Sequence, residues 1–180
     1  MSGDSVLLRA PTTDDGADLW RLARSCGLDL NSPYLYLLWC HDFADTSVIA
    51  QVDQGTVGFV TGYRRPAEPA TLFVSQVAVG KAWRRQGLAI AMLEHLRDRL
   101  APTLRFVEAS VTSSNEASAG LFRSLAASSE VELASGKLFD GFVFPAECPH
   151  DAELLMRVGP FRDSESTPGA RAHLARATPA

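Results

Sequence analysis

The chain has 180 residues and a formal net charge of −4, with 46% hydrophobic and 21% charged residues. This length and composition are typical of one globular domain with a sizeable core. The negative net charge argues against a general surface for nucleic acid or for anionic membranes, so any anion site must be local.

The N-terminal sequence and the cysteines indicate a cytoplasmic protein. Residues 1–11 carry no basic flank and no long apolar run, so we expect no secretory signal, and no stretch approaches the length of a membrane span. The three cysteines, Cys26, Cys40 and Cys148, are odd in number and lack the spacing of a zinc or redox motif. Reduced thiols in a cytosol are the simplest interpretation.

The first 70 residues predict a strand, two helices and a β-hairpin. Residues 5–11 are typical of a strand, and residues 12–27 have apolar side chains at helical spacing. A second helix is expected within residues 31–43, with Ser32 as its cap and Pro33 at its first position. Residues 47–63 predict a hairpin, and the proline-rich residues 64–70 predict a loop.

The rest of the sequence predicts strands that alternate with helices. Residues 71–79 are almost continuously apolar, which indicates a strand buried on both faces. The next helix ends near Leu100 because Pro102 cannot continue it. Residues 105–112 then predict a strand, 113–126 a helix, 131–149 an irregular segment and 152–158 a last strand. The expected apolar stripe of the helix at 113–126 is Ala117, Leu121, Phe122 and Leu125.

This order of elements predicts an α/β fold with a mixed central sheet flanked by helices. It is neither a purely doubly wound pattern nor a barrel. From Arg162 onward the sequence has no apolar periodicity, so we expect a disordered tail over residues 162–180 and a single domain over residues 1–161.

The most informative stretch is VAVGKAWRRQGLAIAMLEHL, residues 77–96, in which an apolar strand passes through a basic turn into an amphipathic helix. Backbone N–H groups at a helix start lack partners within the helix, and the helix dipole favours an anion there. Gly87 lets an oxygen approach the backbone, and Arg84 and Arg85 can add charge-assisted hydrogen bonds. The turn predicts a pyrophosphate site; the alternative is a strand-to-helix turn with solvated arginines.

Two other phosphate motifs do not fit this sequence. Gly80-Lys81 lacks the upstream glycine and the following Ser or Thr of a nucleotide-binding P-loop, and no G-x-G-x-x-G follows an expected strand. His150-x-x-Glu153 is not a zinc-binding H-E-x-x-H motif, so we expect no metal.

Arg84-x-x-Gly87-x-Ala89, between a strand and a helix, resembles the acetyl-CoA signature R/Q-x-x-G-x-G/A of the GNAT acetyltransferase superfamily. The element order fits that fold over residues 5 to about 160, and NEASAGLFRSLA, residues 115–126, resembles its second CoA-contacting segment. The resemblance implies a GNAT acyl-CoA N-acyltransferase fold with acetyl-CoA as co-substrate. The residues it implies for CoA are Val77, Val79, Arg84, Arg85, Gln86, Gly87, Leu88, Ala89 and Asn115.

Four blocks, residues 28–50, 58–79, 112–126 and 150–161, together resemble the family of L-2,4-diaminobutyrate acetyltransferases, the enzymes of ectoine synthesis. This resemblance implies acetylation of the γ-amine by direct attack in a ternary complex, within a homodimer. The sequence departs from the family at Ser75, where a Trp is expected, which implies a wider or more polar pocket. It also has Phe122 where many GNAT relatives place a Tyr acid.

Acetyl transfer needs a donor for the developing oxyanion and a base for the ammonium. The resemblance places the acyl arm of CoA along the strand ending at Val79, with the Val77 amide near the thioester oxygen. An amine with a pKa of about 10 is nearly all protonated at neutral pH, so a carboxylate must accept its proton. The resemblance favours Asp29 and Glu153, against simpler roles as a loop cap and a solvated strand residue. Glu108 is a third candidate base, against the simpler roles of a strand residue that faces solvent or forms a salt bridge.

Polar residues near these carboxylates complete the predicted substrate site. Asn31 and Ser32 stand at a helix start, where they bind a substrate carboxylate or simply cap the helix. Tyr36 is a weaker candidate, and His150 is either a proton shuttle or an exposed loop residue. The predicted substrate-binding residues are Asp29, Asn31, Ser32, Tyr36, Ser75, Gln76 and Glu153.

Two alternatives remain open at this point. One is a GNAT enzyme for another small or peptide amine, which Ser75 allows. The other is a non-catalytic acyl-CoA-binding module, which would leave acetyl-CoA intact in the presence of many amines. The main prediction is a small-molecule substrate, and under either alternative we expect no nucleic-acid or membrane partner.

Overall fold

A computed structural model describes residues 5–161 of the chain; the tail expected over residues 162–180 lies outside the described residues. The strands are β1 (Leu7–Arg9), β2 (Val48–Val52), β3 (Gly55–Arg65), β4 (Glu68–Val79), β5 (Phe106–Thr112), β6 (Leu133–Phe139) and β7 (Glu153–Val158). The helices are α1 (Gly16–Cys26), α2 (Pro33–His41), α3 (Leu88–Leu100) and α4 (Glu116–Ser128). Short 3₁₀ turns lie at Thr13–Asp15, Ala44–Thr46, Lys81–Trp83 and Gly141–Val143.

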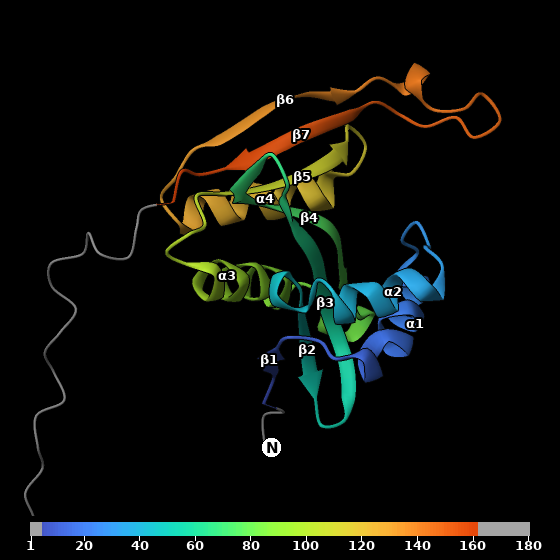
Figure 1. Ribbon diagram of the computed structural model, residues 1–180, viewed down its shortest axis with the longest axis vertical. Helices are drawn as coiled ribbons and strands as arrows, with labels where there is room; N and C mark the ends of the chain where they lie inside the picture. The colour runs from blue at the N-terminus through green and yellow to red at the C-terminus, as the bar shows by residue number, and fades with distance from the viewer. Residues whose placement is uncertain (1–4, 162–180) are drawn as a thin grey trace, which may run out of the picture.

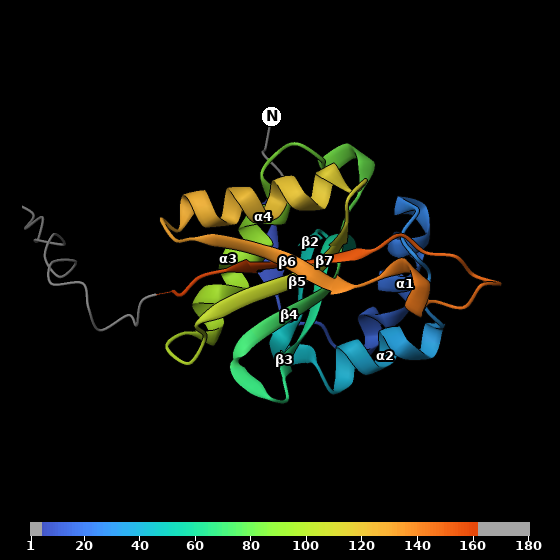
Figure 2. The same ribbon diagram turned by 90° about the horizontal axis from the view of Figure 1, so that it is seen from above.

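The strands form one sheet in the order β1-β2-β3-β4-β5-β7-β6 (Figure 1). β4 and β5 are parallel, and every other neighbouring pair is antiparallel. The helices lie on both sides of this sheet, which Figure 2 shows from above. The mixed sheet with flanking helices confirms the predicted α/β fold class.

The central strands build two cores because successive side chains point to opposite faces of a sheet. Val48 and Val60 face α3 and α4, in a cluster that also contains Met92. Their neighbours Ile49 and Phe59 face the other side and pack in the cluster of α1 and α2. All of these side chains are fully buried. Both helical layers are therefore fixed to the same strands, which makes the sheet the reference frame for the site.

Two expectations about segments were wrong. Residues 64–70 are not a loop, because β3 continues to Arg65 and pairs with β4 from Glu68, leaving a two-residue turn. Residues 131–149 are not wholly irregular, because β6 occupies Leu133–Phe139 at the edge of the sheet. Both segments are largely exposed to solvent. A strand end or edge strand that buries neither face needs no apolar alternation, so its sequence gives no strand signal.

β4 changes its surroundings halfway along its length. Its pairing with β5 ends at Val74 and Ala109. Its register with β3 shifts by one residue at the same point, because Thr61 pairs with Gln76 and the next residue of β3 pairs with Val74. Ser75 is the extra residue of this β-bulge, and a bulge bends its strand. The expected burial of β4 on both faces therefore holds before the bulge and fails at the exposed Ser75.

Candidate active site

The basic turn predicted from the sequence leads directly into α3. Gly87 caps this helix in the left-handed conformation, with φ of 79°, and Arg85 also has a positive φ, of 60°. The first hydrogen bond of the helix runs from the Ala91 amide to the Gly87 carbonyl. The amides of Leu88 and Ala89 therefore have no acceptor within the helix, and they lie at its positive end.

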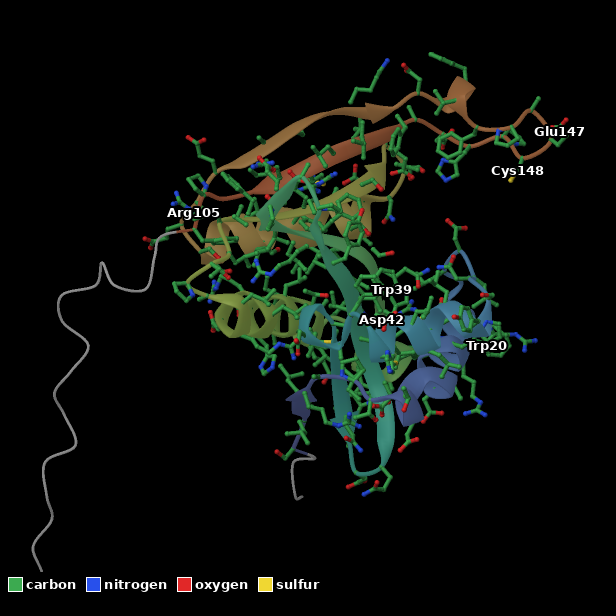
Figure 3. All side chains as sticks on the ribbon, viewed as in Figure 1. Trp20, Trp39, Asp42, Arg105, Glu147 and Cys148 are labelled. Atoms are coloured by element: carbon green, nitrogen blue, oxygen red, sulfur yellow. The ribbon has the colours of Figure 1, made fainter. Side chains whose placement is uncertain are left out.

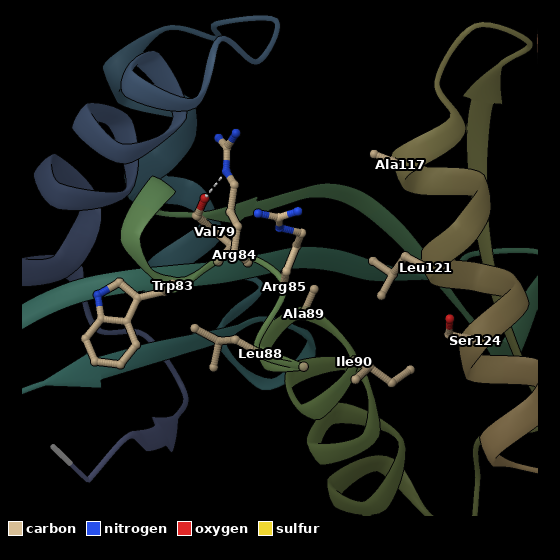
Figure 4. Close-up of a pocket in the computed structure, with 11 residues that line it drawn as sticks. Val79, Trp83, Arg84, Arg85, Leu88, Ala89, Ile90, Ala117, Leu121 and Ser124 are labelled. Atoms are coloured by element: carbon tan, nitrogen blue, oxygen red, sulfur yellow. Dashed lines mark hydrogen bonds between the residues drawn. The ribbon is translucent and has the colours of Figure 1, made fainter. Parts of the chain in front are cut away.

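A cavity of about 500 Å³ opens beside this helix start, between α3 and α4 (Figure 4). Its lining residues are Val79, Trp83, Arg84, Arg85, Gly87, Leu88, Ala89, Ile90, Ala117, Leu121 and Ser124. One end carries two guanidinium groups and free amides, and the rest is apolar. This combination suits an elongated anion with an apolar or neutral tail, so it fits the coenzyme that the signature implies.

The neighbouring side chains of the turn are fixed by their own hydrogen bonds. Arg84 donates from Nε to the Val79 carbonyl at 2.9 Å, which ties the turn to the end of β4 (Figure 4). Gln86 donates from Nε2 to the Ala82 carbonyl at 2.8 Å and is not part of the cavity lining. The Gln86 side chain is thus engaged within the turn itself.

A second cavity of about 360 Å³ lies where β4 and β5 separate. Its wall is predominantly polar and comes from the loop after α1, from β4, β5, the start of α4 and the start of β7. Its lining residues are Leu28, Asp29, Asn31, Ser75, Gln76, Val77, Ser110, Val111, Thr112, Asn115, Ser118, His150 and Glu153. Most residues predicted for substrate thus lie around one cavity, although they are far apart in the sequence.

Glu153 is the least satisfied polar group on this wall. Its side chain is 15% exposed, and its Oε2 is buried without a hydrogen-bond partner among residues 5–161. Its Oε1 lies 3.7 Å from Nε2 of His150. The His150 ring stacks on Phe144, with centroids 4.4 Å apart. A buried carboxylate oxygen without a donor is costly, so this position favours a cationic or hydrogen-bond-donating ligand.

The Val77 amide also faces this cavity. The amide of Gly80 donates to the Val57 carbonyl of β3 at 2.8 Å. Amides point alternately to the two sides of a strand, so the Val77 amide points away from β3. On that side β5 has already left β4. The backbone therefore offers a hydrogen-bond donor toward the gap.

Three of the predicted site residues occupy other surroundings. Ser32 caps α2 by accepting from the Leu35 amide at 3.4 Å, and it is not part of the cavity wall. Tyr36 is fully buried below that wall. Asn115, expected at CoA, lines the polar cavity and accepts from the Ser118 amide at 3.0 Å. The capping predicted for Ser32 is present in the structure.

Glu108 is not available as a base. It is 1% exposed and pairs with Arg65 and, at 2.5 Å, with Arg157. These arginines lie over the rings of Phe73 and Phe106. The salt-bridge interpretation of Glu108 is the one that the structure supports.

Some lining residues were missed by sequence reasoning. Ala117 and Leu121 were predicted in the apolar stripe of α4, but together with Ser124 they line the cavity beside the start of α3. Their spacing of four and then three residues gives α4 a second face, next to the buried Phe122 and Leu125. That spacing was a usable signal, whereas the polar residues of β5 offered none.

Comparisons with known proteins agree with this architecture. Residues 16–126 match the model of the acetyltransferase (GNAT) family. A protein of Streptomyces anulatus named L-2,4-diaminobutyric acid acetyltransferase is 51% identical over 156 residues, 84% of this chain and 88% of that protein. A protein of the same name from Marinococcus halophilus is 42% identical, over 89% of this chain and 93% of that protein.

Solved structures give the same result. Diaminobutyrate acetyltransferase EctA from Paenibacillus lautus, in complex with L-2,4-diaminobutyric acid and coenzyme A, is 41% identical with a TM-score of 0.84, covering 90% of this chain and 99% of that one. The ribosomal-protein-S18-alanine N-acetyltransferase of Escherichia coli, at 17% identity and a TM-score of 0.67, covers 92% of this chain and 100% of that one and shares the fold alone. The chain therefore belongs to the L-2,4-diaminobutyric acid acetyltransferase family, within the acetyltransferase (GNAT) family.

Proposed function

We propose that this chain transfers the acetyl group of acetyl-CoA to the γ-amine of L-2,4-diaminobutyrate, with both substrates bound together, as a step of ectoine biosynthesis. One observation supports this most: the two cavities meet on β4. Val79 lines the cavity at the start of α3, and Val77 lines the polar cavity that contains the unpaired oxygen of Glu153. The relatives carry this activity in their names, and the Paenibacillus lautus enzyme binds both kinds of ligand.

In this proposal the start of α3 binds the pyrophosphate of CoA. Backbone amides of the turn donate to its oxygens, and Arg84 and Arg85 add charge. The acyl arm then runs past Val79 toward Val77, between the separated strands. The cysteamine end of the coenzyme thereby reaches the polar cavity.

The transfer step needs a neutral amine. Glu153 accepts a proton from the γ-ammonium, and the amine nitrogen then attacks the thioester carbon. The Val77 amide donates to the oxygen on which negative charge develops, a contribution typically worth on the order of 3 kcal/mol. As the C–S bond breaks, the nitrogen loses its second proton to give the neutral amide, and the leaving thiolate takes that proton up; with a thiol pKa of about 8.5 it needs no strong acid.

The opposite end of the substrate is oriented by the loop after α1. Asp29 faces the α-ammonium, and Asn31 hydrogen-bonds the α-carboxylate near the start of α2. Ser75 leaves open space in the same wall. A longer amine is therefore the alternative substrate that the cavity accommodates best.

The test is release of the CoA thiol with diaminobutyrate, ornithine and lysine, measured side by side. We expect diaminobutyrate to react fastest, and NMR of the product to show acetylation on the γ-nitrogen. Faster reaction of ornithine, or acetylation mainly on the α-nitrogen, would favour another amine as substrate. Intact acetyl-CoA with all three amines would favour a binding module.

We further propose that the enzyme is a cytoplasmic homodimer. None of the described helices is long and apolar enough to cross a membrane. The arm formed by residues 139–152 exposes Phe142 by 84% and Val143 by 58%. Figure 3 shows Glu147 and Cys148 at the far end of this arm. Light scattering should give twice the monomer mass, and Phe142→Ser should reduce it; a monomeric wild type would refute the dimer.

A further inference from the structure

We propose that Tyr36 and Gln76 are positioning residues, which hold the loop carrying Asp29 at a fixed height above β4 and so set the length of amine that reacts. The inference deepens the proposed function and rests on it, because the loop matters only if Asp29 orients the substrate. Both residues were expected to touch substrate. In the structure Tyr36 is buried below the polar cavity, whereas Gln76 lines it and also connects Tyr36 to the loop.

The connection is a chain of two hydrogen bonds. The Tyr36 hydroxyl donates to Oε1 of Gln76 at 2.9 Å, and Nε2 of Gln76 donates to the Asp29 carbonyl at 2.8 Å. Turning the amide over would bring Oε1 against the Asp29 carbonyl, which is also an acceptor. Only one orientation of Gln76 therefore satisfies both neighbours.

One end of the chain is anchored in the core. The Tyr36 side chain is fully buried, and its ring meets Phe59 edge to face with centroids 6.3 Å apart. Burial raises the pKa of the Tyr36 hydroxyl, against the opposing effects of Gln76 and Asn31. The hydroxyl is thus a neutral donor whose position is set by the packing of α2 on the sheet.

The other end holds a segment with little support of its own. α1 ends at Gly27, whose φ is 71°, and α2 begins at Pro33. Within the described part of the chain, no backbone–backbone hydrogen bond is made by residues 29–31. Gln76 therefore provides the tie between this segment and the sheet. Gln76 is also adjacent in sequence to Val77, so few bonds separate the loop from the Val77 amide.

The arrangement works as a ruler. Asp29 contacts one end of the substrate, and the Val77 amide lies at the reacting end. Gln76 fixes the distance between them, because it bonds the Asp29 carbonyl and precedes Val77 in β4. If the loop keeps its distance from β4, the γ-nitrogen of diaminobutyrate reaches the thioester carbon. The amine of a substrate with one more methylene then lies beyond that carbon. If the loop is released, longer amines can adjust and the preference for diaminobutyrate falls.

Two single-atom variants test this ruler. Gln76→Glu replaces the Nε2 donor by an acceptor that faces the Asp29 carbonyl, and Tyr36→Phe removes the hydroxyl but keeps the buried ring. Tyr63→Phe is the matched control, since Tyr63 packs in the same cluster and its hydroxyl makes no hydrogen bond with residues 5–161. The measured quantities are kcat/KM for diaminobutyrate and ornithine, KM for acetyl-CoA, and NMR order parameters of residues 29–31.

We expect both variants to lower the ratio of kcat/KM for diaminobutyrate to kcat/KM for ornithine about tenfold. One methylene typically changes kcat/KM by roughly 10–200-fold. KM for acetyl-CoA and the ratio of Tyr63→Phe should stay unchanged. In Gln76→Glu the order parameters should fall from about 0.85 toward 0.6.

Other outcomes separate the two ideas. An unchanged ratio with a lower thermal midpoint would show a purely structural role and overturn the ruler. Order parameters of residues 29–31 that stay high in Gln76→Glu would also overturn the positioning role. This measurement does not depend on whether the wild-type enzyme acetylates diaminobutyrate. Failure of the wild-type enzyme to acetylate diaminobutyrate would refute the proposed function and with it the effect on amine length, whereas the order parameters test the hydrogen-bond chain separately.

Discussion

Asp15 illustrates how a single buried charge contributes to this fold. It accepts two hydrogen bonds of 2.8 Å from the Arg9 guanidinium and one of 2.7 Å from the Thr12 amide. Burial alone would raise the pKa of the Asp15 carboxyl, but the hydrogen bonds from Arg9 and Thr12 outweigh it and lower this pKa. The charged carboxylate is therefore the form that the folded chain prefers.

The lowered pKa makes a prediction about acid stability. A carboxyl whose pKa is depressed by folding stabilises the protein above its unfolded pKa of about 3.9, and this contribution is lost as the pH falls through the folded value. Asp15→Asn should cost about 1.5–3 kcal/mol at neutral pH, and its stability should fall less steeply below pH 4 than that of wild type. Urea unfolding at several pH values measures both. Parallel acid limbs in the two proteins would contradict the role of this carboxyl.

Glu153 gives a prediction about catalysis. Glu153→Gln keeps the shape of the side chain but cannot take a proton, so kcat/KM for diaminobutyrate should fall by about 10²–10⁴ at neutral pH. The rate of the variant should recover as the pH approaches the pKa of the amine, because free amine is then supplied by the solvent. Acetyl-CoA affinity, measured by calorimetry, should not change. A raised KM without this pH dependence would assign Glu153 to binding rather than to proton transfer.

The sequence predicted the roles of some of these residues but not of others. Ser32 was predicted as a cap because capping depends on neighbouring residues only. Glu153 was one of several carboxylates with similar surroundings in the sequence, and its buried oxygen became visible only when strands β4, β5 and β7 were placed together. The positioning role of Gln76 depends on a contact with Asp29, 47 residues away, which no local pattern encodes.

At the scale of elements, the start of α3 is the feature on which CoA binding depends. Gly87 is a poor position to test it, because its φ of 79° would strain any larger residue and destabilise the turn. Ala89, in the first turn, is a better one. A carboxylate there favours the helix through the helix dipole, typically by 0.3–1 kcal/mol, yet it repels a bound pyrophosphate.

Ala89→Glu should therefore bind CoA much more weakly while its thermal midpoint stays at or above that of wild type. Ala89→Gln is the matched control, with nearly the same size and no charge, and it should retain more of the affinity. Isothermal calorimetry with CoA and a thermal melt without it give the two numbers. Equal affinity for the two variants and wild type would place the pyrophosphate elsewhere.

The elements that carry burial were predictable and those that do not were missed. β5 and α4 bury alternate or helically spaced apolar residues, so their periods appear in the sequence. β6 has no buried residue at all. It is a strand because β7 offers it hydrogen bonds, and that reason lies outside its own sequence.

At the scale of the whole molecule, a charge network joins four strands on the face that carries α2. Glu108 of β5 lies between Arg65 of β3 and Arg157 of β7, and Arg157 also contacts Glu68 of β4 at 2.9 Å. Glu108 is almost fully buried, whereas the Glu68 side chain is 53% exposed. The two glutamates of one network therefore have very different surroundings.

This difference predicts unequal effects of mutation. Glu108→Ala leaves two partly buried arginines without their shared partner and should cost about 3–5 kcal/mol of unfolding free energy. Glu68→Ala removes an exposed partner, which solvent screens, and should lower the free energy of unfolding far less. Guanidinium chloride would screen these charges, so unfolding in urea is the appropriate measurement. Equal costs for the two variants would mean that burial does not govern the network.

The separation of β4 from β5 gives the sheet an edge in its interior. Beyond Val74 and Ala109 the facing sides of the two strands are unpaired, like the outer side of a terminal strand. A ligand in that gap occupies the place of the missing strand pairing. Because the unfolded chain cannot bind this ligand, its binding raises the free energy of unfolding. At 100 times its Kd a ligand contributes about 2.7 kcal/mol. The lifetime of the folded protein is thereby linked to the concentration of whatever fills the gap, so loss of that ligand would speed unfolding as well as stop the reaction.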